Sequence, residues 1–319
     1  MTATATDQTR IVDARQLAAM LGVRQEQLPL ASLQALASTD LGHEVLHGAA
    51  REEQLLRALR GSEATNLTVS GPHRADDWER GWNQNLREFE QAGDEPALLV
   101  PKYNRHLVVR LGGDYVRVAH PHFEYTVYTA LRHALFAQWF AGLDRVVEYG
   151  CGTGTSLMLL AQQYRHLALC GLDWAPSSQQ ILTRLSAHLR RPIEAMRFDM
   201  FAPTPLGLGP RCGVFTSAAM EQLGERHDAL LEHWLAGNPA ICVHLEPIYE
   251  LYDETSLFDD VARRYHRARG YLRGFLPKLR ALAAAGRIEI LAEQRTGLGS
   301  FFHEGYSVVV WRPTARGAE

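Results

Sequence analysis

The sequence predicts an α/β fold, doubly wound around a mostly parallel sheet. Three observations lead to this prediction. A glycine-rich turn separates an apolar run from a helix-like segment, acidic residues follow successive apolar runs, and strand-like and helix-like segments then alternate along the chain. Such alternation is typical of parallel strands joined by helices that pack on both faces of the sheet.

The glycine-rich turn lies at residues 148–155, Glu-Tyr-Gly-Cys-Gly-Thr-Gly-Thr. Glycines allow a tight turn and let a ligand approach the backbone, where a side chain would block it. The N–H groups at the start of the following helix add donors and a positive dipole end. A strand, a glycine turn and a helix in this order predict a site for an adenosine-containing cofactor. Single residues separate Gly150, Gly152 and Gly154, whereas a dinucleotide fingerprint has two residues between its second and third glycines.

Acidic residues follow the next two strand-like runs. The apolar run 167–172 ends at Asp173, about twenty residues after the turn, where a carboxylate can accept hydrogen bonds from ribose hydroxyls. Trp174 comes next and could pack against an adenine ring. A third strand-like run ends at Asp199 and Met200. The acids at these strand ends, together with the glycine turn, predict a nucleotide site at one edge of the sheet.

The pattern of the turn, E-x-G-x-G-x-G, resembles motif I of the class I S-adenosylmethionine-dependent methyltransferases. The resemblance covers residues 120–312 and implies a mostly parallel seven-stranded sheet that ends in an antiparallel hairpin, with S-adenosyl-L-methionine as cofactor. It also implies that the glycine turn lies beside the methionine part of the cofactor, and that Asp199 and Met200 hold the adenine. The cofactor-binding residues predicted in this way are Glu148, Gly150, Gly152, Gly154, Asp173, Trp174, Asp199, Met200 and Ser217.

The remaining chain continues the alternation of strands and helices. The strand-like segments are 212–217, 240–245, 287–293 and 306–311, and the helix-like segments are 228–234 and 257–285. The last two strands have no helix between them, which predicts one antiparallel member of the sheet.

Residues 1–119 differ from the rest and predict a helical N-terminal region with a hairpin, packed on a cofactor-binding domain of residues 120–319. The helix-like segments here are 11–21, 28–46 and 52–59. Trp78 and Trp82 share a helix face, and we expect them to pack in a core rather than on a ligand. Residues 112–114, Gly-Gly-Asp, lie between two apolar runs and predict the hairpin. By resemblance to the family, such a region covers the acceptor pocket or forms the contact of a homodimer.

Bulk composition excludes several partners. The chain has 319 residues and a formal net charge of −3, so no broad basic field favours nucleic acid. No stretch approaches the roughly twenty apolar residues that span a bilayer, and the N-terminus lacks the apolar core of a signal peptide. Four cysteines fall on or beside predicted strands and predict reduced thiols in a cytoplasmic protein: Cys151, Cys170, Cys212 and Cys242.

Candidate catalytic residues follow the fourth and fifth strands, where a doubly wound sheet places its reacting groups. Methyl transfer needs acceptor, methyl carbon and sulfur nearly in line, and an oxygen or nitrogen acceptor can also need a base. His244 is the preferred base, because histidine titrates near neutrality, but it could equally be a histidine satisfied inside the sheet. Glu221 and Glu246 are the other candidates, and a capping or surface acid is the alternative for Glu221. His303 could join His244 and Glu246 around a metal, but no dense ligand spacing supports this and we predict no metal site.

The absence of known motifs narrows the class of methyl acceptor. Nucleobase amino-methyltransferases resemble one another in an Asn/Asp-Pro-Pro-aromatic loop, where this chain has Ser-Ala-Ala-Met at 217–220. A cytosine C5 enzyme would carry a Pro-Cys nucleophile there, and Cys212 lies at the other end of its strand. Protein arginine enzymes carry two glutamates, and Glu221 has no clear partner. We therefore predict a small-molecule metabolite as acceptor, methylated on oxygen, carbon or nitrogen.

Three other functions stay open at this point. An NAD(P)-dependent oxidoreductase shares the sheet and the ribose acid, although the glycine spacing argues against it. A non-catalytic or scaffolding protein could keep the cofactor-binding fold without transfer. Aminopropyl transfer from S-adenosylmethionine is a third alternative.

Overall fold

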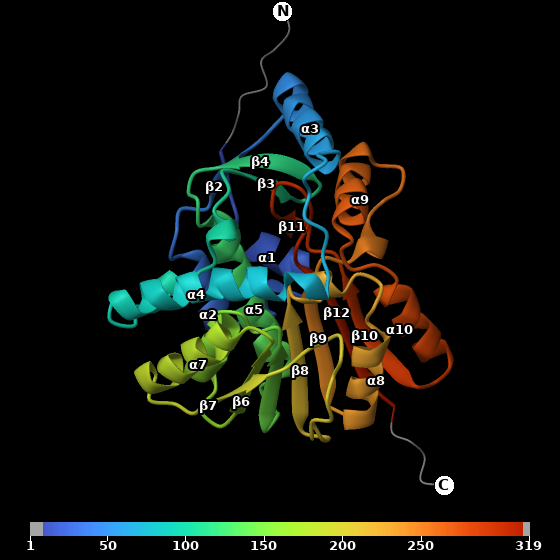
Figure 1. The fold of residues 1–319 in the computed structure, drawn as a ribbon. Coiled ribbons are helices and arrows are strands. Elements are labelled where there is room, and N and C mark those ends of the chain that lie inside the picture. The colour runs from blue at the N-terminus through green and yellow to red at the C-terminus, as the bar shows by residue number, and fades with distance from the viewer. Residues whose placement is uncertain (1–8, 315–319) are drawn as a thin grey trace, which may run out of the picture.

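The computed structural model describes residues 9–314 and contains two sheets. The strands of the larger sheet are β5 (Arg145–Tyr149), β6 (Ala168–Asp173), β7 (Ile193–Arg197), β8 (Cys212–Ser217), β9 (Ile241–Glu246), β10 (Ile288–Gln294) and β12 (Ser307–Pro313). They form a seven-stranded sheet in the order β10-β12-β9-β8-β5-β6-β7 (Figure 1). The strand β12 runs antiparallel to both β10 and β9, and the other neighbours pair in parallel. The predicted fold class, including its one antiparallel member, is confirmed.

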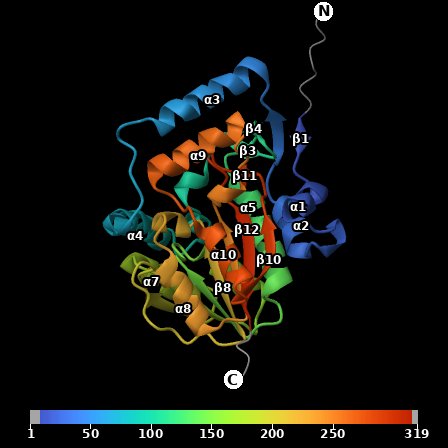
Figure 2. The same ribbon diagram turned by 90° about the vertical axis from the view of Figure 1, so that its right-hand side faces the viewer.

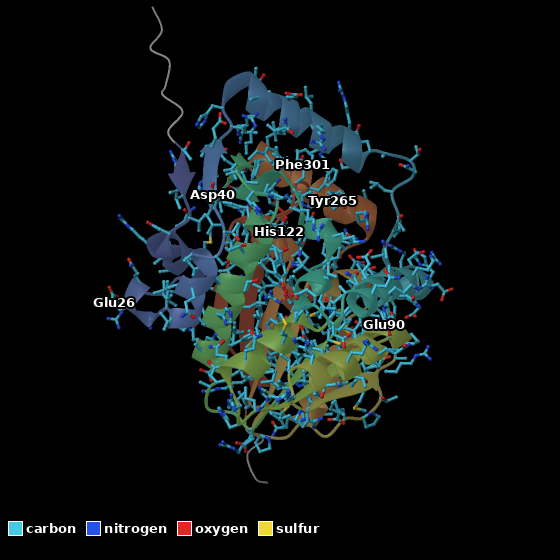
Figure 3. All side chains as sticks on the ribbon, turned by 90° about the vertical axis from the view of Figure 1, so that its left-hand side faces the viewer. Glu26, Asp40, Glu90, His122, Tyr265 and Phe301 are labelled. Carbon is cyan, nitrogen blue, oxygen red and sulfur yellow. The ribbon has the colours of Figure 1, made fainter. Side chains whose placement is uncertain are left out.

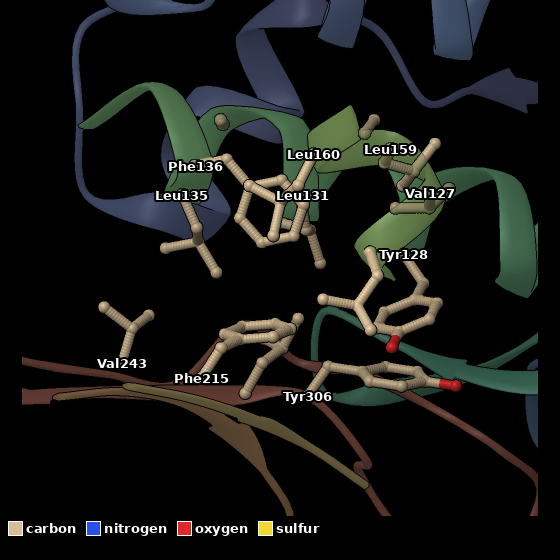
Figure 4. Close-up of a cluster of buried hydrophobic side chains, with 14 of the residues drawn as sticks. Val127, Tyr128, Leu131, Leu135, Phe136, Leu159, Leu160, Phe215, Val243 and Tyr306 are labelled. Carbon is tan, nitrogen blue, oxygen red and sulfur yellow. The ribbon is translucent and has the colours of Figure 1, made fainter. Parts of the chain in front are cut away.

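Helices cover both faces of this sheet. The first face carries α5 (Phe123–Trp139), α6 (Thr155–Gln163) and α7 (Pro176–His188), and the second carries α8 (Asp228–Gly237) and α10 (Phe275–Ala284). Strand side chains alternate between the two cores, so Val146 packs with the first set of helices and its neighbour Val147 with the second. Figure 4 shows part of the first core, where Phe136 of α5 lies over Phe215 of β8.

The N-terminal region builds a second, smaller sheet with helices around it. The helices are α1 (Ala14–Leu21), α2 (Leu30–Leu36), α3 (Gly48–Ser62) and α4 (Ala75–Gln91), and the strands are β1 (Arg10–Ile11), β2 (Gly42–Val45), β3 (Val108–Leu111), β4 (Asp114–Val118) and β11 (Leu298–Gly299). The order is β1-β2-β4-β3-β11, and β3 and β4 form the predicted hairpin. The strand β11 comes from the C-terminal part of the chain, so the two regions are joined by a shared sheet.

Short 3₁₀ segments connect these elements at Gln25–Gln27, Pro72–Arg74, Pro96–Leu99, Lys102–Asn104, Met220–Leu223 and Tyr249–Leu251. The helix α9 (Leu257–Arg269) lies beside α3 (Figure 2). Tyr265 and Phe301 lie below α3 (Figure 3), where Phe301 belongs to a small apolar core shared by α3 and α9. No helix within residues 9–314 is both long and apolar enough to cross a membrane.

Two helix predictions were wrong in part. Residues 28–46 form only the short helix α2 and then the strand β2, because residues 42–45 pair with β4 and with β1. The stretch 257–285 is two helices rather than one. Gly270 ends α9 with a φ of 61°, and Gly274 precedes α10 with a φ of 76°. These left-handed conformations suit glycine and turn the chain between the helices.

Candidate active site

A cavity of about 930 Å³ opens at the carboxyl ends of β5, β6 and β8. Its walls come from the loops after these strands, from α4 and α5, from the segment 101–104 and from the start of β12. Two carboxylates, Glu148 and Asp173, line the cavity, and the lining residues include no lysine, arginine or histidine. The lining therefore favours a cationic or uncharged ligand over an anionic one.

The glycine turn forms the floor of this cavity. Gly150 and Gly152 line it, with φ angles of 71° and 51° that favour glycine. A Cβ on Gly150 would overlap the Cβ of Ala219, and one on Gly152 would lie 3.0 Å from the ring of Trp82. The turn is therefore packed too closely on its neighbours to accept side chains at these two positions.

Glu148 is one of three cavity-lining side chains, with Trp78 and Gln222, that have a buried polar atom without a partner in the described chain. It is 3% exposed, and its Oε2 atom makes no hydrogen bond within the described chain. Burial raises its pKa to about 8, against the opposing effects of Ser156 and the Arg132 guanidinium. A buried carboxylate oxygen without a partner costs free energy unless a ligand completes it, and an ammonium group would do so.

Asp173 is held at the end of β6 by the turn itself. Its Oδ2 accepts a hydrogen bond from the Gly152 N–H at 2.8 Å, and its Oδ1 accepts one from Ala175 N–H at 2.9 Å. Burial raises its pKa to about 6, although these two hydrogen bonds favour the charged form. Each oxygen has a further lone pair, so the fixed carboxylate can accept hydrogen bonds from a diol.

The other predicted cofactor residues divide into two groups. Trp174, Met200 and Ser217 line the cavity. Gly154 and Asp199 do not line it. Gly154 lies at the start of α6, where a Cβ would overlap Leu182 of α7, so its position serves close packing of the two helices. Asp199 is exposed, and its Oδ1 accepts a hydrogen bond from the Phe201 N–H at 2.8 Å.

His244 lies inside the sheet rather than in the cavity. It is fully buried, its Nε2 accepts a hydrogen bond from the Trp311 indole N–H at 2.9 Å, and its Nδ1 lies 2.9 Å from the Thr216 hydroxyl. Burial lowers its pKa to about 3. Both ring nitrogens are satisfied within the core and neither faces the cavity, so we do not include His244 among the groups proposed to act on an acceptor.

Glu246 holds the loop that follows β8. Its carboxylate accepts hydrogen bonds from the N–H groups of Ala219 and Met220 at 3.1 to 3.2 Å. Burial raises its pKa to about 8. The loop includes Ala218, a non-glycine residue with a φ of 48°, and both Ala218 and Ala219 line the cavity. Glu246 is therefore placed to fix the cavity wall, including its one strained residue, rather than to contact a ligand.

Glu221 lies one residue from the cavity wall. Its Oε1 accepts a hydrogen bond from the side-chain amide of Gln222, which lines the cavity, at 3.2 Å. Burial raises the pKa of Glu221 to about 7, and Arg269 acts in the opposite direction. None of Glu221, Glu246 and His244 lines the cavity itself.

Of the residues weighed as metal ligands, His303 lies beside another histidine. The Nδ1 of His303 lies 3.2 Å from the Nε2 of His266 on α9, whereas His244 is enclosed by the sheet. Among the side chains of residues 9–314, no group of three or more histidines, cysteines, aspartates or glutamates is arranged to hold a metal ion.

Sequence reasoning missed most of the aromatic wall at the other end of the cavity. Tyr103, Tyr125, Tyr128 and Tyr306 line that end together with Asn104. These residues come from three separate segments, and no spacing in the sequence connects them.

Trp78 and Trp82 line the cavity from α4. Trp82 is 8% exposed and belongs to the main core, as predicted, but its ring also closes over the glycine turn. The expectation of core packing alone therefore describes only part of its environment.

The sequence is similar to that of a known methyltransferase over part of its length. No family model matches the sequence. The chain is 28% identical over 177 residues to a trans-aconitate 2-methyltransferase from Methylobacterium nodulans, a match that covers 53% of this chain and 60% of the relative. The chain thus matches less than two thirds of the length of that relative.

Two solved structures are among those similar to this chain. The [4+2]-cyclase SpnF is 13% identical with a TM-score of 0.50, over 79% of this chain and 100% of that one. The O-methyltransferase NcsB1, solved with S-adenosylmethionine and a naphthoic acid, is 16% identical with a TM-score of 0.39, over 95% of this chain and 89% of that one. At these identities the likeness to SpnF concerns the fold alone.

Proposed function

We propose that this protein is an S-adenosylmethionine-dependent methyltransferase that acts on a small molecule. The observation that carries the proposal is the unpartnered Oε2 of Glu148, which lies in one cavity with the glycine turn and the fixed carboxylate of Asp173. An ammonium group would complete Glu148, a ribose diol would suit Asp173, and the lining bears no cationic side chain that would repel a sulfonium. The match to a named methyltransferase supports the same activity.

When bound, S-adenosylmethionine supplies a methyl group made electrophilic by its sulfonium. This chain contributes by binding and orienting the cofactor and by excluding water from the reacting region. Glu148 and Asp173 would fix the two polar ends of the cofactor, and Trp174 and Met200 offer apolar surface for its adenine. Glu246 would keep the loop at 218–220 in place against the reacting region.

The N-terminal region would cover the site. Trp78 and Trp82 of α4 and Tyr103 reach the cavity from that region, which supports a covering role ahead of a homodimer contact. We also propose a cytoplasmic location, since the four cysteines are all buried and free. A small-molecule acceptor suits this cavity, because aromatic side chains and a few polar groups line it.

Labelled methyl transfer tests the proposal. The purified protein would be incubated with trideuteromethyl-labelled cofactor and a small-metabolite extract, and the products analysed by mass spectrometry. We expect at least one metabolite to gain the label in a reaction that S-adenosylhomocysteine inhibits. Labelling of protein or nucleic acid with no labelled metabolite would contradict the small-molecule assignment.

The same preparation separates the alternative functions. If the protein were an NAD(P)-dependent oxidoreductase, bound NADH would quench its tryptophan fluorescence. We expect no quenching by NADH and a rise in the melting temperature with S-adenosylhomocysteine. A non-catalytic protein would bind S-adenosylhomocysteine and label no metabolite. Aminopropyl transfer would instead give products without the methyl label.

A further inference from the structure

A chain of hydrogen-bonded side chains leads from the aromatic end of the cavity to the surface. The Tyr306 hydroxyl donates to Glu124 Oε1 at 2.9 Å, and the other oxygen, Oε2, lies 3.1 Å from His106 Nδ1. Tyr306 lines the cavity, the Glu124 side chain is 2% exposed, and the His106 side chain is 35% exposed. The three groups therefore connect the cavity with solvent through one buried carboxylate.

The surroundings of Tyr306 fix its hydroxyl at the cavity wall. Its ring stacks on that of Tyr128 with centroids 4.6 Å apart (Figure 4). The Tyr128 hydroxyl in turn lies 2.7 Å from the Ser217 hydroxyl, at the end of β8. The other polar neighbour of the Tyr306 hydroxyl is Asn104 Oδ1, at 3.4 Å. This wall thus adjoins the strand end where a doubly wound sheet places its reacting groups.

The chemistry of this wall defines an acceptor. Tyrosine rings line this wall and no charged side chain does, which suits an uncharged flat ring. Tyr128 already stacks on Tyr306 and has the Arg132 guanidinium 3.9 Å from its ring centroid, so a ligand would stack on the other rings. Burial raises the pKa of Tyr306, and the Glu124 carboxylate raises it further, so the phenol keeps its proton. Tyr306 can therefore donate its proton only while its oxygen accepts another proton. An acceptor phenol of ordinary acidity is a stronger acid than Tyr306, so it can donate its proton to the Tyr306 oxygen as Tyr306 donates its own to Glu124.

We propose that the acceptor is an uncharged compound with an aromatic hydroxyl, and that its proton leaves through Tyr306, Glu124 and His106. The inference rests on the proposed methyltransferase function. The acceptor oxygen gains the methyl carbon, and the leaving sulfur keeps the electron pair of the broken carbon–sulfur bond. The acceptor proton passes to the Tyr306 oxygen as the proton of Tyr306 passes to the Glu124 carboxylate. Glu124 then exchanges that proton with solvent through His106.

Acceptors of different acidity test this route. The full-length protein would be assayed with labelled cofactor and either phenol or 4-nitrophenol, which is far more ionised near neutral pH and needs little help in losing its proton. We expect Glu124→Gln to slow phenol methylation by about 100-fold or more, the usual share of a general base, and 4-nitrophenol methylation by less than about tenfold. Tyr306→Phe, which keeps the stacked ring, should show the same selectivity.

A matched control and a binding measurement complete the test. Glu304 is an equally buried carboxylate that pairs with Arg295 outside the cavity, so Glu304→Gln should affect both acceptors alike. Unchanged binding of S-adenosylhomocysteine to each variant, measured by calorimetry, would show that the cofactor site is intact. Equal slowing of both acceptors by Glu124→Gln and Tyr306→Phe, or no slowing, would overturn the relay. If the wild-type protein binds S-adenosylhomocysteine but methylates neither phenol, the acceptor class is wrong while the proposed function stands.

Discussion

The two ends of the cavity are built in different ways. The cofactor end consists of consecutive turns after β5, β6 and β7, so its side chains lie close together in the chain as well as in space. The aromatic end joins Asn104, Glu124 and Tyr306, which are separated by up to 202 residues. The cofactor end therefore depends on the conformation of a few turns. The aromatic end depends instead on the packing of the N-terminal region against the main sheet.

The largest effect on the cofactor end is expected from Gly150→Ala. The new Cβ would overlap Ala219 at a φ of 71°, so we expect loss of S-adenosylhomocysteine binding and a fold destabilised by about 3 kcal/mol. Calorimetry and chemical denaturation measure the two effects. Gly142→Ala is the control, because nothing lies within 4 Å of that Cβ. Normal binding by the Gly150 variant would mean that the turn does not approach the ligand.

Removal of the Asp173 carboxylate should have the next largest effect. Asp173→Ala should weaken S-adenosylhomocysteine binding by about 1–3 kcal/mol, because the ribose hydroxyls lose a charged acceptor. The control is Asp144→Ala, since Asp144 is an exposed acid that pairs with Arg211 away from the cavity. Equal affinity of the Asp173 variant and the wild type by calorimetry would count against the ribose assignment.

The protonation of Glu148 should have a smaller effect on cofactor affinity. Its pKa in the free protein is about 8, and an ammonium beside it would lower that pKa, so binding must release protons near pH 7. The affinity should therefore rise with pH by at most about 1.4 kcal/mol per unit, and level off above pH 8. Calorimetry in buffers of different ionisation enthalpy measures the protons released. Glu148→Gln should abolish the release, and release that persists in this variant would assign it to another group.

His244 should have no effect on the cofactor end. His244→Ala leaves the Trp311 N–H without its partner and removes one partner of the Thr216 hydroxyl, so we expect the free energy of unfolding to fall by about 2 kcal/mol. Affinity for S-adenosylhomocysteine should stay unchanged. Chemical denaturation and calorimetry give both values. A clear loss of affinity without loss of stability would return His244 to the active site.

The difference between the two ends also explains what the sequence could predict. The glycine turn and Asp173 are local signals, because a strand, a turn and a helix follow one another within a few residues. The parallel pairing of most strands follows from the same alternation. The relay from Tyr306 to His106 has no local signal, since its three members meet only after the two sheets pack.

The departures from the sequence expectations have the same origin. The sequence leaves His244 open between a base and a histidine satisfied inside the sheet, and only the packing of Trp311 and Thr216 beside it shows that both of its nitrogens are used. Residues 42–45 follow a helical pattern, yet pairing with β4 outweighs their local preference. Local pattern thus predicted much of the cofactor end, although Gly154 and Asp199 do not line the cavity, whereas long-range packing produced the aromatic end.

Calorimetric titration of the wild-type protein with S-adenosylhomocysteine tests the central claim most directly. We predict saturable binding of one molecule per chain, weakened by Asp173→Ala and accompanied by proton release that Glu148→Gln abolishes. The absence of any binding heat, together with an unchanged melting temperature, would contradict the assignment of this cavity to the cofactor.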